Sequence, residues 1–497
     1  MKKRLLLNTT TSLLMQAVAV ICGFVLPRLI LERFGSETNG LIQSISQFLG
    51  MISFLEMGVG QVIQSSLYRP LVQGDTEGIS CVIRSGSRYF RKIAYALIVY
   101  IAVLVALFPY ITDNSFEWQY TAVLIVAISI GSFAQYYFGI IDKILLSADQ
   151  RGYVQYTVQI FTTLLNTAVS VILILLGSSI LVVKTCSAFV FLLNPLIIRW
   201  YISRNYQINR SIQYKGEPIK QKWNGVAQHI AAVVVEGTDN VILTLFSTLS
   251  NVSIYSTYFL VIGGVKQLYM ALVVGVQSLV GELWAKQERD KLYSAFQKIE
   301  ILLHSLVVFL FSCVAILIVP FVTVYTDGLT DANYYQPLFS GILTLAYGIR
   351  YLRTSYNILI LAGGHYKQTQ VCHIVTALLN IIISIFAVSF FGLVGIAIGT
   401  LVAFTYQTLW MMIYSSKHLL KWPLRNAIKQ LLVDIVTVVC ILFATSWIEL
   451  AKVSYWGWLR MAIPVALIAL AITILTAVLF NRSVVMDLFK QHLRKKA

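Results

Sequence analysis

The feature that most constrains this fold is a succession of fourteen long apolar stretches separated by short polar connections. A hydrocarbon core about 30 Å thick requires roughly twenty apolar residues per spanning helix, and each stretch reaches that length. Because the stretches are continuous, they indicate helices rather than the alternating strands of a β-barrel. We therefore expect an all-α integral membrane protein with about fourteen transmembrane helices. The predicted spans are 8–33, 39–68, 92–112, 118–147, 153–177, 180–201, 223–247, 252–281, 299–322, 334–362, 367–390, 393–415, 427–448 and 459–480.

The composition supports this class. Of the 497 residues, 58% are hydrophobic and 12% are charged, whereas charged residues make up about a quarter of ordinary soluble proteins. The first apolar run follows Met1-Lys2-Lys3-Arg4 and resembles a secretory signal, but it continues past Pro27 without an A-x-A-like cleavage site. We interpret it as a retained first helix.

The net charge of +17 is explained by membrane topology. By the predicted spans, most Lys and Arg residues lie in the N-terminal segment, the even-numbered connections and the C-terminal tail. The odd-numbered connections contain only Lys452 and Arg460. This asymmetry follows the positive-inside rule, so both termini are predicted to be cytoplasmic, and nucleic-acid binding is not needed to account for the charge.

Two short similarities indicate an internal repeat. Segment 34–40 (FGSETNG) resembles 246–252 (FSTLSNV), and 162–166 (TTLLN) resembles 376–380 (TALLN) at nearly the same separation. Each repeat contains six helices, an even number, so the two halves enter the membrane from the same side and form a parallel repeat. Such halves can rock about a central cavity, as in a secondary transporter.

The repeat predicts the domain organisation. We expect an N-lobe at 1–201, a cytoplasmic linker at 202–222 and a C-lobe at 223–415. Segment 416–497 then holds two further helices and a basic cytoplasmic tail.

Three segments carry a resemblance to a known family: the turn from Arg33 to Gly40, 56–60 (EMGVG) and 238–243 (TDNVIL). With the two-lobed repeat, they resemble the multidrug/oligosaccharidyl-lipid/polysaccharide (MOP) exporter superfamily, and within it the polysaccharide-flippase (Wzx-type) branch. The resemblance implies a V-shaped core of twelve helices, as in the MATE transporters, plus two more. It also implies a non-enzymatic flippase of the bacterial cytoplasmic (inner) membrane that moves undecaprenyl-pyrophosphate-linked oligosaccharide units by alternating access. Membrane lipids and the polysaccharide polymerase machinery are the implied partners.

Basic residues inside the predicted helices agree with such a substrate. Each costs about 2.5–3.5 kcal/mol on insertion scales, so it is expected to face a cavity or a partner. Guanidinium groups bind phosphate oxygens in bidentate geometry, which suits a pyrophosphate. The predicted cationic cavity contains Arg28, Lys266, Arg350 and Arg353.

The positions of these bases leave an alternative open. Arg350 and Arg353, three residues apart, share one helix face, and Arg28 follows Pro27, which removes a helix hydrogen bond. In the alternative interpretation Arg28 pairs with Glu32, and the other two arginines neutralise intramembrane acids.

Three acids inside the helices form a smaller group: Glu56, Glu236 and Asp239. They are candidates for coupling transport to H⁺ or Na⁺, or for a gating salt bridge with Arg28. Burial raises the pKa of a carboxyl group and a nearby Arg lowers it, so the sequence leaves both roles open, together with simple packing.

Other residue types indicate little chemistry. Tyr347 and Tyr351 could stack on sugar rings or serve in packing. His229, His304 and His373 lie singly on helices and are interpreted as hydrogen-bonded packing residues rather than proton relays. The six cysteines show no metal-ligand spacing, and no phosphate-binding loop is present, so neither a metal, an organic cofactor nor ATP is expected.

Two other classes of function remain as alternatives. A multidrug cation antiporter would need an acid-lined cavity with few bases. A membrane glycan polymerase or ligase would usually need a large outer loop with paired Arg, His or carboxylates, and the predicted outer loops are short.

Overall fold

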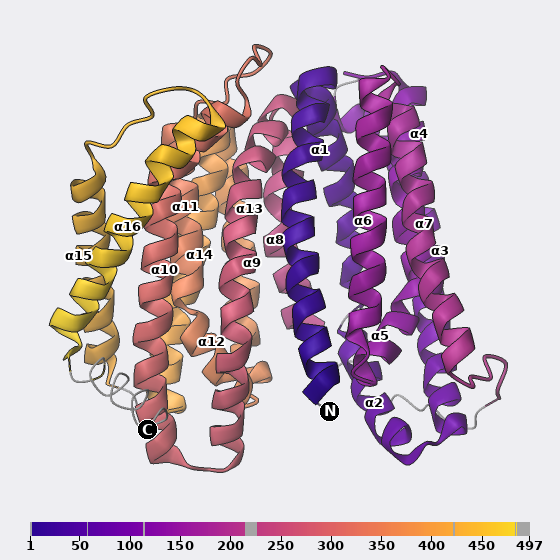
Figure 1. Cartoon of the computed structure of the whole chain (residues 1–497), viewed down its shortest axis with the longest axis horizontal. Coiled ribbons are helices and arrows are strands. Elements are labelled where there is room, and N and C mark those ends of the chain that lie inside the picture. Colours follow the sequence, from indigo (N-terminus) through magenta and orange to yellow (C-terminus); the bar gives the residue numbers. More distant parts are fainter. Residues whose placement is uncertain are drawn as a thin grey trace. The chain divides into compact units, whose positions relative to one another are not determined.

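The computed structural model describes residues 2–56, 58–112, 115–213, 226–420, 423–482 and 484, and every regular element among them is a helix. Figure 1 shows the helices running lengthwise beside one another within each part of the chain. The first elements are α1 (Lys2–Gly50), the 3₁₀-helix η1 (Met51–Glu56), α2 (Val59–Gln73), α3 (Thr76–Ile111), α4 (Trp118–Ala134), the π-helix η2 (Gln135–Gly139), α5 (Ile140–Ala148), α6 (Gly152–Leu175), α7 (Ile180–Asn205) and α8 (Val226–Phe246). They are followed by α9 (Leu249–Ala285), α10 (Arg289–Tyr325), α11 (Pro337–Leu352), α12 (Thr354–Ala362), α13 (Tyr366–Phe391), α14 (Leu393–His418), α15 (Leu424–Thr445) and α16 (Tyr455–Phe480).

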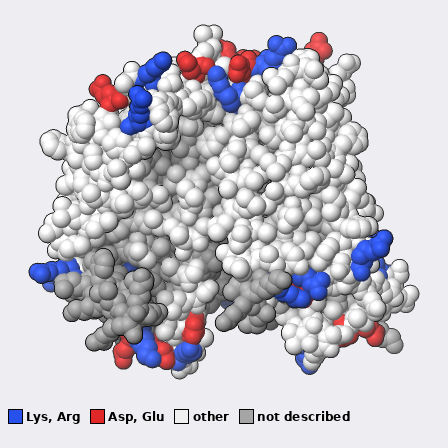
Figure 2. Space-filling view, in the orientation of Figure 1, with Lys and Arg blue, Asp and Glu red and all other residues white. Residues whose placement is uncertain are grey.

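The prediction of an all-helical membrane protein is confirmed. Eleven helices in the described part of the chain are long and apolar enough to cross a membrane. The three other predicted spans are also helical: 39–68 is joined to the first span, 223–247 corresponds to α8, and 334–362 is divided between α11 and α12. On the face shown in Figure 2, charged side chains gather near the two ends of the helices and leave a nearly uncharged band between them, as a hydrocarbon environment requires.

The chain divides into two compact units, Met1–Ser253 and Ile254–Ala497. The division falls inside α9, so α8 packs with unit 1, although the repeat assigned it to the second lobe. The predicted lobe limits remain a prediction, and most of the proposed linker, 214–222, lies outside the described residues.

Unit 1 is held together partly by a close approach of α1 to the start of α9. A Cβ atom on Gly40 would lie 1.8 Å from the Leu249 carbonyl oxygen, so only glycine fits there. Nearby, the Asn39 amide donates to Ser253 (2.8 Å), and the hydroxyls of Ser44 and Thr244 are 2.7 Å apart. The predicted turn after Arg33 is thus a packing site, and the chain bends there at Gly35, whose φ is +83°.

The second predicted span is broken near its middle. After η1 the backbone turns at Gly58, with a φ of +71° that favours glycine, and α2 begins at Val59. Backbone carbonyls released by such a break need other donors in a membrane. The hydroxyls of Tyr89 and Tyr100 supply them, donating to the carbonyls of Leu55 (2.7 Å) and Phe48 (2.9 Å). The break is therefore built into the fold.

Unit 2 contains two tightly packed helix pairs and two added helices. α13 packs on α14 so closely that a Cβ on Gly399 would lie 2.1 Å from the Ser384 hydroxyl oxygen. The span made by α11 and α12 is interrupted at Arg353, and α11 also packs on α14. The last two helices, α15 and α16, pack on α10.

Candidate functional site

The predicted site residues are distributed over both units. Arg28, Glu56, Glu236 and Asp239 belong to unit 1, and Lys266, Tyr347, Arg350, Tyr351 and Arg353 belong to unit 2. Their arrangement around one common cavity stays a prediction.

In unit 1, the charges of α1 and η1 both have nearby partners. The Arg28 Nε atom lies 4.0 Å from an oxygen of Glu32, four residues further along the helix, and the Glu32 side chain is 63% exposed. The ion pair of the alternative interpretation is therefore present. Glu56 lies at the break of the second span, where the Tyr136 hydroxyl donates to its Oε1 at 2.7 Å.

The two acids of α8 differ in burial. Asp239 is buried whereas Glu236 is exposed, although the residues are three positions apart. Between them Gly237 faces Gln47 of α1, whose Nε2 would lie 2.6 Å from a Cβ at that position. Their coupling or gating role is a prediction.

In unit 2, the two arginines at the α11–α12 interruption both contact α14, consistent with a shared helix face. The guanidinium carbon of Arg350 lies 4.8 Å from the ring centroid of Phe404, a cation–π contact. The Nη1 atom of Arg353 lies 3.5 Å from the sulfur of Met411. Both side chains are half-buried, and so is that of Lys266 in α9. The described contacts thus place two guanidinium groups beside apolar side chains.

The tyrosines beside these arginines are part of the protein core. The Tyr347 ring packs edge-on against Phe404, with centroids 5.4 Å apart. The Tyr351 ring lies 5.2 Å from Tyr269 and 5.5 Å from Phe311. In this structure both rings contact other protein rings, and stacking on sugars remains a prediction.

A buried ionisable group in unit 2 was not predicted. Nδ1 of His304 on α10 lies 2.6 Å from Oδ2 of Asp434 on α15, and the Tyr356 hydroxyl donates to Glu300 at 2.5 Å. The interpretation of His304 as a packing residue missed this pairing. A signal was available, because Asp434 is an acid within an apolar stretch.

A second unpredicted feature lies around the π-helix of unit 1. Asp142 in α5 is fully buried and pairs with Arg210, beyond the end of α7, with Nη2 2.7 Å from Oδ1. Two further arginines lie over aromatic rings of η2: Arg91 over Tyr137 at 5.0 Å and Arg199 over Phe138 at 5.5 Å. π-Helical turns are frequent at functional sites.

Asp149, between α5 and α6, binds several side chains at the end of unit 1 where α1 begins. Its carboxylate lies 2.8 Å from Arg151 and 3.7 Å from Arg4, and it accepts a hydrogen bond from the Tyr206 hydroxyl at 2.6 Å. Burial, together with this hydrogen bond, raises the pKa of Tyr206. Tyr206 therefore stays a neutral donor.

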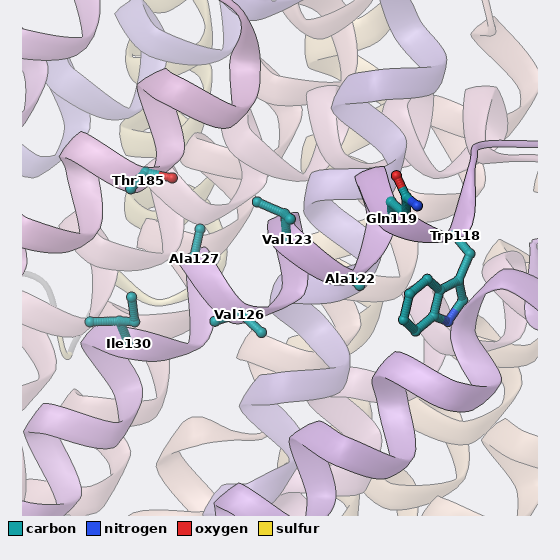
Figure 3. A pocket seen from close by; sticks show the side chains of 8 residues that line it. All are labelled: Trp118, Gln119, Ala122, Val123, Val126, Ala127, Ile130 and Thr185. Carbon is teal, nitrogen blue, oxygen red and sulfur yellow. The ribbon is translucent and has the colours of Figure 1, made fainter.

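Figure 3 shows an apolar groove of unit 1 whose lining comes from α4 and one residue of α7. Its volume is about 620 Å³, and none of its lining residues is charged, so it suits hydrocarbon rather than a phosphate headgroup. It is lined by Trp118, Gln119, Ala122, Val123, Val126, Ala127, Ile130 and Thr185.

The fold is similar to that of a solved lipid flippase and of solved transporters that are described as MOP superfamily members. A structure of the lipid II flippase MurJ in an inward closed conformation has a TM-score of 0.70 and 13% identity, and the similarity covers 97% of this chain and 100% of that one. A multidrug-resistance MATE family transporter in an outward-facing conformation has a TM-score of 0.57 and 13% identity, over 84% of this chain and 96% of that one. A MOP superfamily transporter from Pyrococcus furiosus, described as having a binding pocket of reverse polarity, has a TM-score of 0.56 and 14% identity, over the same shares of the two chains. No protein-family model and no curated protein sequence matches the chain.

Proposed function

We propose that this protein is a flippase for lipid-linked oligosaccharides, most specifically for undecaprenyl-pyrophosphate carriers in the bacterial cytoplasmic membrane. The observation that carries the proposal is the pair Arg350 and Arg353, half-buried within a spanning segment and three residues apart. Two guanidinium groups at this spacing match the oxygens of a pyrophosphate.

The extent of the shared fold supports a lipid-linked substrate over a multidrug cation. The MurJ structure covers 97% of this chain and the MATE structure 84%. The MurJ structure thus covers more of this chain than the MATE structure does, and the difference is comparable in length to the segment from α15 to the C-terminus. A substrate with a long polyprenyl chain also needs apolar surface beside its polar cavity, and an apolar groove such as that in Figure 3 is suited to hydrocarbon.

The remaining parts of the proposal follow from the sequence. Arg28 and Lys266 remain candidate substrate-binding residues, and Glu56, Glu236 and Asp239 remain candidates for gating or for coupling transport to H⁺ or Na⁺. Both termini are placed in the cytoplasm by the positive-inside rule, and the flipped saccharide is released on the opposite face of the membrane to the polymerase machinery.

The test is a flipping assay in proteoliposomes with undecaprenyl-pyrophosphate carrying one fluorescent sugar. The readout is the fraction of probe that an external, membrane-impermeant quencher reaches over time. Replacing both Arg350 and Arg353 by Ala should slow flipping at least about tenfold, since a charge-assisted hydrogen bond contributes about 1.5–3 kcal/mol. Arg350→Lys should restore little, because Lys lacks the planar bidentate fork.

Arg289→Ala is the matched control, because Arg289 is an exposed arginine at the start of α10. It should flip the probe at the wild-type rate. Wild-type flipping by the double Arg variant would refute the site. Extrusion of a cationic dye by the wild-type protein, without movement of the lipid probe, would instead establish the multidrug alternative.

A further inference from the structure

The buried acids and the buried histidine of the described part of unit 2 lie together with Tyr356 on α10, α12 and α15. The exposed fractions are 0% for His304, 2% for Glu300, 2% for Tyr356 and 5% for Asp434. Ionisable groups at such positions in a membrane protein are costly and commonly mark ion or proton pathways. None of the four belongs to the predicted cationic cavity.

These side chains form one contiguous group. His304 is hydrogen-bonded to Asp434 (2.6 Å), and Glu300 accepts from Tyr356 (2.5 Å). The two pairs meet because the His304 and Tyr356 rings lie edge to face, with centroids 6.3 Å apart. Glu300 also lies one helical turn before His304, so the carboxyl group and the imidazole are neighbours on α10.

A polar column connects this group to the end of α16. The Gln430 amide donates to Oδ1 of Asp434 (2.9 Å), and the Asn481 amide donates to the Gln430 carbonyl oxygen (3.1 Å). Asn481 is half-buried just beyond α16. A cavity of about 10 Å³ lies along the same residues and is lined also by Thr437, Thr473 and Thr476, which is about the space that one water molecule needs.

Other charged groups on the helices that pack against α10 contact different residues. Arg350 on α11 and Arg353 just beyond its end contact α14, and Tyr351 packs on Phe311. On α15, Lys429 donates to the Phe480 carbonyl, and on α16 Arg460 lies over Trp456. Among the described titratable groups, Asp434, Glu300 and Tyr356 thus contact His304 or one another.

The chemistry of the group favours a proton over a metal ion. Hard metal ions take about six or more oxygen ligands, whereas here one oxygen of Asp434 already accepts from Gln430 and the other faces an imidazole nitrogen. Among the described residues, no set of three His, Cys, Asp or Glu side chains is arranged to hold a metal. Imidazole is the side chain whose protonation changes near neutral pH.

We propose that Glu300, His304, Tyr356 and Asp434 form a proton-binding site, reached from the end of α16 past Asn481. With Asp434 ionised and Glu300 protonated, one proton from water forms an N–H bond on His304. The net charge of the four side chains then changes from −1 to 0. This step rests on the proposed flippase function: the proton is coupled to transport, because its uptake converts a hydrogen bond between the neutral imidazole on α10 and the Asp434 carboxylate on α15 into an ion pair.

The experiment is a pH titration of the full-length protein in lipid nanodiscs, followed by infrared difference spectroscopy of imidazole and carboxylic-acid bands. The wild type should show an imidazole protonation signal accompanied by a shift of a carboxyl band. His304→Gln and Asp434→Asn should each lose this joint signal. His373→Gln is the matched control, because His373 is hydrogen-bonded to the Gln407 amide rather than to a carboxylate, and it should keep the signal.

The double variant His304→Gln/Asp434→Asn guards against loss of folding, because it retains an uncharged hydrogen bond at the same place. It should fold and lack the signal. Persistence of the joint signal in the folded double variant, or its loss in His373→Gln alone, would overturn the proposal.

Coupling is tested separately with the fluorescent undecaprenyl-pyrophosphate probe under an imposed proton gradient. The gradient should accelerate flipping by the wild type and by His373→Gln but not by the double variant. Equal acceleration of the double variant would refute coupling. The infrared titration requires no substrate, so failure of the flippase proposal, seen as absence of flipping by the wild type, is distinguishable from failure of the proton site.

Discussion

Each unit contains a buried aspartate paired with a basic side chain, but the two basic side chains differ in chemistry. In unit 1, Asp142 is paired with Arg210 at 2.7 Å. In unit 2, Asp434 is paired with His304 at 2.6 Å. Arginine keeps its charge at any physiological pH, whereas the unperturbed pKa of histidine is about 6.5. The first pair is therefore a permanent connection, and the second can respond to protons.

The surroundings of the two pairs reinforce this difference. The Arg210 side chain is 29% exposed and follows the end of α7, so water can solvate part of its charge. His304 is fully buried within α10. The titratable partner thus lies where a change of charge has the largest energetic effect, since desolvation strengthens electrostatic interactions.

The largest expected effect comes from removing the aspartate of unit 2. Asp434→Ala should lower the free energy of unfolding by about 3–5 kcal/mol, because it leaves a buried His304 without its counter-ion. Chemical unfolding in detergent micelles at mildly acidic pH measures the change. Asp290→Ala, at an exposed position on α10, should change stability by no more than about 0.5 kcal/mol. Equal stability of the two variants would show that the buried pair contributes little.

An intermediate effect is expected from giving unit 1 the chemistry of unit 2. Arg210→His should make the Asp142 pair sensitive to pH, with about 1–2 kcal/mol of stability present at mildly acidic pH and lost as pH rises through the pKa of the new imidazole. The sign follows because a carboxylate partner raises the folded-state pKa of a histidine. Thermal unfolding across this pH range tests it, with Arg210→Lys as the control that should show no additional pH dependence. If the stability of Arg210→His did not change with pH, the contrast drawn between the arginine pair and the histidine pair would be contradicted.

The smallest effect concerns the tyrosine of each unit that donates to a glutamate. Tyr356→Phe should cost about 1–1.5 kcal/mol and Tyr136→Phe about 0.5–1 kcal/mol, within the usual range for one hydrogen bond. The difference arises because Glu300 is buried, whereas Glu56 is half-buried and can bind water instead. Unfolding of the two variants at one pH gives the comparison. A larger loss of stability for Tyr136→Phe than for Tyr356→Phe would show that burial of the glutamate does not determine the strength of the hydrogen bond.

The positions of the helices could be predicted because each spanning segment must be apolar over its whole length. The interruptions at Gly58 and Arg353 could not, since a broken helix is stabilised by distant partners. The hydroxyls of Tyr89 and Tyr100 that satisfy the first break belong to α3, and nothing in the local sequence indicates them.

The candidate site was predicted only in part, for a similar reason. Arg350 and Arg353 stand out as charges in an apolar stretch, and their spacing of three residues predicts that they share one helix face. His304 and Asp434 are 130 residues apart, and pairing between two helices cannot be deduced from the periodicity of either one. The rule applied to the arginines also singles out Asp434, but it does not identify its partner.

The π-helix η2 and the interruption at Arg353 occupy matching places in the predicted repeat. At the separation that relates Thr162 to Thr376, the π-helical residues 135–139 correspond to 349–353, where α11 gives way to α12. Each half of the predicted repeat thus has an irregular turn, here called a joint, at the corresponding position of its fourth helix. Bending at such a joint swings one end of a helix while the other stays packed, as happens at many mid-helix irregularities. In the second half this joint carries Arg350 and Arg353, so any bending would move the two guanidinium groups along with the helix end.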